Sequence, residues 1–141
     1  MASSVPDAAP SSDPATPSAG ERLRRQVMGD VFVDRAWAKA DAFSAPLQSL
    51  VQDHAWGATW QRPGLALKQR SLCTVSMLAA LGHLQELKGH LRGALNNGAT
   101  LEELREVLLH VGPYAGIPAA VAAFRAAQEW MAEQGLSFDG P

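Results

Sequence analysis

The sequence has a single cysteine, Cys73, among its 141 residues. A lone thiol excludes an internal disulfide, a paired redox motif and a metal site built from several thiolates. The chain also lacks the apolar core of a signal peptide, and it lacks an apolar run of the roughly 20 residues that cross a bilayer. We therefore expect a cytoplasmic protein with no membrane partner.

An excess of positive charge is missing as well. The chain carries 12 basic and 14 acidic residues, for a formal net charge of -2. Nucleic acids and anionic membranes are bound through clustered positive charge, so neither is expected as a partner. The hydrophobic fraction of 47% is enough for one soluble domain with a core of its own.

Residues that favour strands are too few and too scattered to form alternating runs, so we expect an all-α fold. Residues 1–20 are almost entirely Ala, Ser, Pro and Asp and predict a disordered N-terminal tail. The helical domain is expected over residues 21–135, followed by a short C-terminal tail at 136–141. We expect six helices with short connections and no internal repeat.

Helix boundaries are marked by short polar and glycine signals. Asp34 is a candidate N-cap, and Gly57 suits a left-handed turn that ends a helix over 45–56. Asn96-Asn97-Gly98 predicts the C-cap of a helix. Thr100 and Glu103 have the T-x-x-E spacing of a capping box that opens the next helix, and Gly116-Ile117-Pro118 predicts a break before the last one. The helices over 67–81 and 117–135 carry more apolar surface than a small bundle covers, which predicts burial between subunits.

The helix expected over 83–96 carries the most informative polar residues. Helical spacing places His83, Glu86 and His90 in one stripe beside a leucine stripe. Glu86 and His90 are four residues apart, so the carboxylate can orient the imidazole and raise its pKa, which would suit a general acid. A solvated surface pair is the more common meaning of this spacing. A metal site on these three residues is a weaker alternative, and we expect no metal because no HExxH motif is present.

Each of the other candidate site residues has two interpretations, one structural and one functional. Arg70 lies on a largely buried helix and needs an anion, either a protein group such as Glu86 or a substrate carboxylate. Arg92 falls nearly opposite His90 on the helix and is more typical of a solvated or interface arginine. Trp56 and Trp60 could wall a pocket or belong to the core.

Several stretches resemble the carboxymuconolactone decarboxylase family, within the AhpD-like superfamily, in order and spacing. They are His54-Ala55-Trp56-Gly57, Glu86-Leu87-x-x-His90, Ala94-Leu95-Asn96-Asn97-Gly98 and Tyr114-x-Gly116-Ile117-Pro118. The similarity extends over about residues 21–133. The peroxidases of this superfamily carry a CxxCxxxH motif, and here the corresponding residues are His83, Glu86 and His90, so dithiol peroxidase chemistry is excluded.

The resemblance implies a six-helix AhpD-like fold that assembles as a homotrimer or homohexamer. It implies loss of CO₂ from 4-carboxymuconolactone, an acidic lactone, to give 3-oxoadipate enol-lactone without a cofactor, in the protocatechuate branch of the β-ketoadipate pathway. In this interpretation Arg70 binds the substrate anion, and His90, oriented by Glu86, delivers a proton. His83 or Arg92 would stabilise the oxyanion, and Trp56, Met77 and Tyr114 complete the substrate-binding set. Pro113 is expected to kink its helix and displace Tyr114.

Two alternatives remain at this point. One is an enzyme of the same fold that decarboxylates or isomerises a related lactone or dienol in another pathway. The other is a non-catalytic helical oligomer that binds a small anion.

Overall fold

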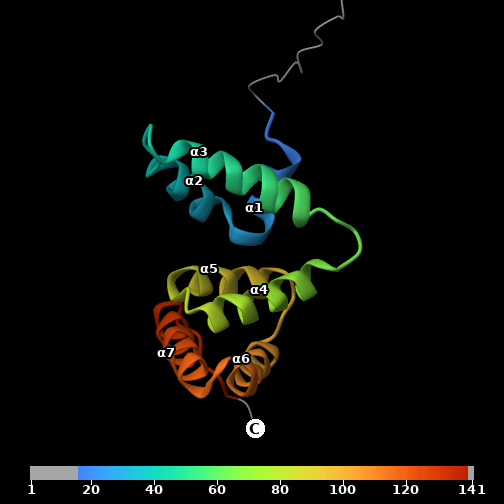
Figure 1. The fold of residues 1–141 in the computed structure, drawn as a ribbon. Coiled ribbons are helices and arrows are strands. Elements are labelled where there is room, and N and C mark those ends of the chain that lie inside the picture. The colour runs from blue at the N-terminus through green and yellow to red at the C-terminus, as the bar shows by residue number, and fades with distance from the viewer. Residues whose placement is uncertain (1–15, 140–141) are drawn as a thin grey trace, which may run out of the picture.

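The structure, a computed structural model, describes residues 16–139 and consists of helices joined by short connections (Figure 1). No strand occurs among the described residues, which confirms the all-α prediction. The described residues form seven α-helices and the π-helix η1, which continues directly from α3, in place of the six helices expected. The elements are α1 (Ala19–Met28), α2 (Asp30–Ala38), α3 (Ala45–Leu50), the π-helix η1 (Val51–Thr59), α4 (Leu67–Leu81), α5 (Leu84–Asn96), α6 (Leu101–Ala115) and α7 (Ile117–Glu133).

The first helix begins slightly earlier than the sequence predicted. Ser18 caps α1 by accepting a hydrogen bond from the backbone N–H of Glu21 at 3.1 Å, so the helix starts at Ala19. Residues 1–15, where most of the expected disordered tail falls, lie outside the described residues. The prediction of Asp34 as an N-cap is wrong, because α2 already begins at Asp30, directly after Gly29.

The predicted end of the third helical segment is also wrong. Gly57 does not form a left-handed turn; it lies inside η1, which continues to Thr59. The wider π-helical winding is visible at its end, where the Trp60 N–H donates to the carbonyl of Ala55, five residues back, at 2.9 Å. The sequence signal failed because the helix continues through Gly57, whose backbone packs closely against Gly20 of α1.

The C-terminal half follows its sequence signals closely. Asn97 caps α5 and is followed by Gly98 at φ +90°. Thr100 and Glu103 form the predicted reciprocal capping box at the start of α6. Gly116 separates α6 from α7, and α6 runs on through Pro113 to that point.

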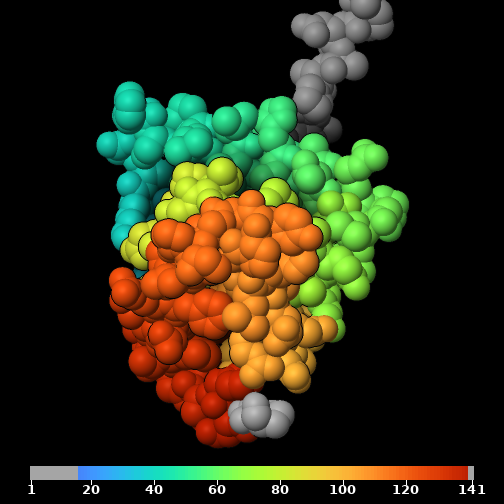
Figure 2. All heavy atoms as spheres, turned by 60° about the horizontal axis from the view of Figure 1, so that its bottom comes forward, coloured from blue at the N-terminus to red at the C-terminus, as the bar shows by residue number. Residues whose placement is uncertain are grey.

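The helices form two layers (Figure 1). Helices α4 to α7 enclose the larger core, around Leu87, Leu91 and Leu108. The second layer, formed by α1, α2, α3 and η1, packs around Trp56 and Trp60. Figure 2 shows α6 and α7 covering the end of the molecule opposite this second layer. Helix α5 packs against α4 and α7 on one side and α1 on the other, so its residues face both layers.

Glycines allow α1 to approach two other helices closely. A Cβ on Gly20 would lie only 2.5 Å from the backbone oxygen of Gln52 and 2.9 Å from the backbone nitrogen of Gly57. On α5, a Cβ on Gly93 would lie 3.1 Å from Val27, and one on Gly89 would lie 3.2 Å from Met28. The backbone of α1 is therefore held at a fixed, short distance from both η1 and α5.

We expect Gly20→Ala to destabilise the protein, because the atom it would contact is backbone and cannot rotate away. The free energy of unfolding should fall by about 1–3 kcal/mol, the usual cost of overpacking. Gly64→Ala is the matched control, since a Cβ at Gly64 meets nothing within 4 Å and its φ is not positive. Urea unfolding of both variants measures the effect, and equal stabilities would contradict the tight α1–η1 crossing.

Candidate active site

A cavity of about 140 Å³ lies where α1, α2, η1 and α5 meet. Its polar side chains are one guanidinium, one carboxylate and one imidazole, and the remaining wall is apolar. The lining residues are Arg24, Met28, Phe32, Val51, Trp56, Glu86 and His90. This volume is well below the roughly 300–1,000 Å³ of pockets for drug-sized ligands, so the cavity suits a small molecule.

His90 projects from α5 against Trp56 and Trp60 of the second layer, whose rings stack on each other with centroids 4.6 Å apart. Its ring centroid is 6.2 Å from that of Trp56 and 6.3 Å from that of Trp60, and the Trp56 and His90 rings are almost parallel at 2°. Its Nδ1 is buried and has no hydrogen-bond partner within residues 16–139. The imidazole is thus held by packing rather than by a hydrogen bond through Nδ1.

Burial lowers the pKa of His90 to about 4, while the nearby charge of Glu86 acts in the opposite direction. The prediction that Glu86 raises this pKa is therefore right about Glu86's own effect and wrong about the net result. Desolvation destabilises the protonated imidazole more than the single carboxylate of Glu86 stabilises it, because the ring packs against indole rings. In the free protein at neutral pH, His90 is therefore neutral.

Arg24 is the site residue that the sequence analysis missed. It is buried, with 4% of its surface exposed, and its Nη2 donates to the Gln48 side chain at 3.1 Å. The Nε and Nη1 atoms have no hydrogen-bond partner in the described part of the chain. A signal existed, because helical spacing places Arg24 in one stripe with Gly20, Val27 and Met28, and an arginine on a buried face needs an anion.

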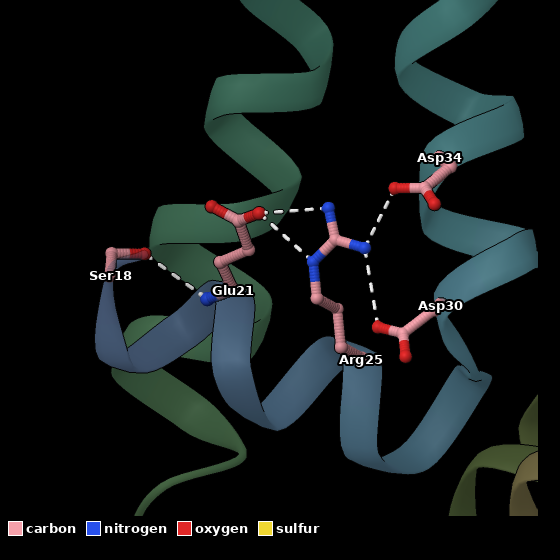
Figure 3. Close-up of polar contacts among 5 residues, drawn as sticks. All are labelled: Ser18, Glu21, Arg25, Asp30 and Asp34. Atoms are coloured by element: carbon pink, nitrogen blue, oxygen red, sulfur yellow. Dashed lines mark hydrogen bonds and ion pairs between the residues drawn. The ribbon is translucent and has the colours of Figure 1, made fainter. Parts of the chain in front are cut away.

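The neighbouring Arg25 has the opposite environment (Figure 3). It lies 3.0 Å from Glu21, 3.3 Å from Asp30 and 2.7 Å from Asp34, and so joins α1 to α2. These contacts raise the pKa of Arg25, with the hydrogen bond to Asp34 as the main cause. The carboxylates of this region are therefore engaged by Arg25 rather than by Arg24.

The structure brings together three of the eight residues that the sequence analysis named for the site: His90, Glu86 and Trp56. Arg70 donates from Nη2 to the carbonyl of Arg62 at 2.8 Å and does not line this cavity.

The other four named residues also lie elsewhere in the subunit. His83 is the exposed N-cap of α5, and Arg92 is exposed on the same helix. Met77 and Tyr114 line a separate groove between α4 and α6. Any contact between these residues and a ligand in the cavity would therefore have to come from a second subunit.

His83, Glu86 and His90 do not converge as metal ligands would. Within residues 16–139, no three His, Cys, Asp or Glu side chains are grouped so that they could hold a metal ion. Across the same residues, no helix is both long enough and apolar enough to cross a bilayer.

Comparison with known proteins identifies the class to which this fold and cavity belong. The profile of the carboxymuconolactone decarboxylase family matches residues 45–129, which include η1 and all of α4 and α5. The chain therefore belongs to the carboxymuconolactone decarboxylase family, as the resemblance predicted.

Two characterised relatives are decarboxylases. A 4-carboxymuconolactone decarboxylase of Acinetobacter baylyi is 41% identical over 118 residues, which cover 84% of this chain and 88% of the relative. The nitrosuccinic acid decarboxylase npaB of Metarhizium robertsii is 42% identical over 110 residues, which cover 78% of this chain and 77% of the relative. The two relatives thus share one reaction type and act on different acids.

The low pKa of His90 predicts a specific loss of stability in acid. The unfolded chain binds a proton at His90 as the pH falls below about 6.5, whereas the folded chain does so only near pH 4. Stability contributed by this residue is therefore complete above pH 6.5 and is lost as the pH falls toward 4. Between pH 7 and pH 4.5 the wild type should lose about 2 kcal/mol more than His90→Phe, which keeps a packed ring without a titrating group. Urea unfolding at several pH values measures this difference, and parallel curves would contradict the assigned burial.

Proposed function

We propose that this protein decarboxylates 4-carboxymuconolactone to 3-oxoadipate enol-lactone at the cavity between α1, η1 and α5. The observation that carries the proposal is the combination in one small cavity of an imidazole with a buried Nδ1, a carboxylate, an unpaired guanidinium and an indole wall. The Acinetobacter relative, named for this reaction, supports the choice of substrate.

The substrate needs little chemical help to lose CO₂. Its departing carboxylate is bonded to a ring carbon that is conjugated, through the ring double bond, with the lactone carbonyl. When the C–C bond to the carboxylate breaks, the electron pair moves into the ring and forms a dienolate with negative charge on the lactone oxygen. Protonation of the ring carbon next to that carbonyl then gives the enol-lactone. The substrate is its own electron sink.

His90 is the group we assign to proton delivery, with Glu86 on the preceding turn of α5. The empty site favours neutral imidazole, so the proton must arrive as the substrate binds. A substrate dianion in a cavity of low polarity stabilises a nearby imidazolium and raises the pKa of His90 toward neutrality. Glu86 acts in the same direction. His90 is thus protonated when the substrate is present and can act as general acid.

The apolar part of the wall serves the departing carboxylate. Met28, Phe32 and Val51 line the cavity and have no hydrogen-bond donor to offer this group in return for the water it loses. CO₂ is uncharged, so an apolar surface favours the product of bond cleavage over the reactant carboxylate.

A second candidate substrate class follows from the Metarhizium relative, which is named for nitrosuccinic acid. Nitrosuccinate and 4-carboxymuconolactone are both substituted succinates. In each, the carbon that loses CO₂ carries a CH₂COO⁻ group and an electron acceptor, which is the nitro group in one and the unsaturated lactone in the other. Parallel assays of the two acids would assign the preferred substrate.

We expect His90→Asn to lower kcat for 4-carboxymuconolactone by about 10²–10⁴-fold, the usual contribution of a positioned general acid. Glu86→Gln should lower it by about tenfold, since Glu86 supports the imidazolium rather than donating the proton. Ultraviolet absorbance of the lactone and release of CO₂ measure turnover. His54→Asn is the matched control, because His54 is exposed on η1 and does not line the cavity.

The result also tests the proposal as a whole. Full activity of His90→Asn would remove His90 from the reaction. No turnover of this lactone by folded wild-type protein, together with turnover of nitrosuccinate, would move the chain to the second substrate class. Inactivity toward both acids would favour the non-catalytic anion-binding alternative.

We also propose that the protein assembles as a homotrimer or homohexamer through the groove between α4 and α6. The groove is about 770 Å³ in volume and is lined mainly by apolar side chains. Its Met77 is 55% exposed and Tyr114 is 82% exposed, and Leu81 near the end of α4 is 68% exposed. Large apolar side chains gathered on one surface are typical of subunit interfaces.

Tyr114→Glu should shift the assembly toward monomer, because a carboxylate would be buried in an apolar interface without a partner. Phe43→Glu is the control, since Phe43 is even more exposed, at 94%, but lies in the turn before α3. Light scattering after size-exclusion chromatography gives the mass of each variant. An unchanged mass for Tyr114→Glu would place the interface elsewhere.

A further inference from the structure

Arg24 is an unusual residue in this fold. Of the charged side chains that the structure describes, it alone is buried, with 4% of its surface exposed. Burial lowers the pKa of Arg24, but a guanidinium titrates so far above neutrality that it stays charged in the cell. The fold therefore encloses a permanent positive charge.

The protein does not neutralise this charge. The contact from Nη2 to Gln48 is to a neutral amide, and the three N–H groups on Nε and Nη1 have no acceptor among residues 16–139. Glu21, the acid on the adjacent turn of α1, accepts from Arg25 instead at 3.0 Å. A buried cation without a counter-ion costs several kcal/mol, so a pocket that retains one is built for an anionic ligand.

Arg24 shares its cavity with His90 and Glu86. An anion on Arg24 is therefore part of the same small molecule that meets the imidazole. Arg24 is the one permanent cation among the side chains that line the cavity, and Glu86 repels anions from its own side. An anionic group is therefore expected next to Arg24.

The chemistry of decarboxylation decides which carboxylate Arg24 can bind. A cation on the departing carboxylate would stabilise the reactant more than the transition state, because that group loses its charge as CO₂ forms, and the reaction would slow. A cation on a carboxylate that keeps its charge stabilises reactant and transition state alike and contributes binding. Arg24 must therefore hold the retained group.

We infer that Arg24 binds the retained carboxymethyl group of the substrate and so makes the site specific for succinate-like dicarboxylates. This inference rests on the proposed decarboxylase function for the reaction, but the anion site itself does not. Arg24 replaces Arg70 in the role of anion binding, because Arg70 lies outside the cavity.

Kinetics of Arg24→Met and Arg24→Lys test this role. Arg24→Met should raise KM about 100-fold or more and lower kcat much less, because it removes charge-assisted hydrogen bonds that are present in both reactant and transition state. Arg24→Lys should restore part of the affinity, since it keeps the charge without the planar fork. Arg35→Met is the matched control on the exposed face of α2 and should behave like wild type.

A binding experiment separates this inference from the proposed reaction. Calorimetry should show that wild type binds monomethyl succinate more tightly than dimethyl succinate, because only the monoester offers Arg24 a carboxylate, and that Arg24→Met loses this preference. The ligand-free Arg24→Met protein should also melt at a higher temperature than wild type, because it no longer buries an unpaired charge.

The outcomes are distinct. Wild-type decarboxylation with an unchanged KM in Arg24→Met would overturn the role of Arg24 and leave the reaction intact. Preference for the monoester over the diester that depends on Arg24, in a protein that decarboxylates neither 4-carboxymuconolactone nor nitrosuccinate, would support the anion site and overturn the reaction. Equal binding of monomethyl and dimethyl succinate by wild type would overturn carboxylate binding by Arg24.

Discussion

The close approach of α1 to both η1 and α5 fixes the position of every polar group in the cavity. Gly20 lets the backbone of α1 approach that of η1 at Gln52 and Gly57, and Gly89 and Gly93 give α5 the same access to α1. Arg24 follows Gly20 by one helical turn, and His90 lies directly after Gly89. The glycines that permit the packing are thus close in sequence to the residues to which we assign the chemistry. A shift of α1 against α5 would change the distance between the Arg24 guanidinium and the His90 imidazole.

His90 and Arg24 both lie in an unfavourable environment inside this enclosure. Burial against the indoles of Trp56 and Trp60 drives His90 toward its neutral form, and Arg24 keeps a charge without a counter-ion. In the reaction that we propose, a dianionic substrate relieves both conditions, since one carboxylate pairs with Arg24 and the added negative charge favours the imidazolium. Under that proposal one electrostatic interaction supplies both the binding energy and the protonation of His90, and the free protein loses stability by keeping Arg24 unpaired and His90 desolvated.

Sequence reasoning succeeded where the determining interactions are local. The capping box at Thr100, the end of α5 at Asn97 and the break at Gly116 depend on residues a few positions apart, and all three predictions were confirmed. It failed where distant segments meet. The backbone of η1 at Gly57 packs against Gly20, some 37 positions away, and His90, whose pKa is lowered by burial, packs on Trp56 and Trp60 from another layer. Helical spacing placed Glu86 and His90 together, and it also puts Arg24 on the buried stripe of α1. That this stripe faces His90 depends on the packing of α1 against η1 and α5, which no local pattern encodes.

The charges of the proposed cycle balance without a proton from solvent during the chemical step. Without substrate, the formal charges of Arg24 and Glu86 sum to zero although the two side chains form no ion pair, and His90 is neutral. The substrate brings two negative charges and His90 takes up one proton, so the filled cavity carries one net negative charge. Loss of CO₂ and transfer of that proton to the ring carbon leave a monoanionic product on Arg24 and a neutral imidazole, which again gives one net negative charge. The reaction therefore returns His90 to the form that its burial favours, and the transition state need not accumulate charge that the apolar wall would oppose.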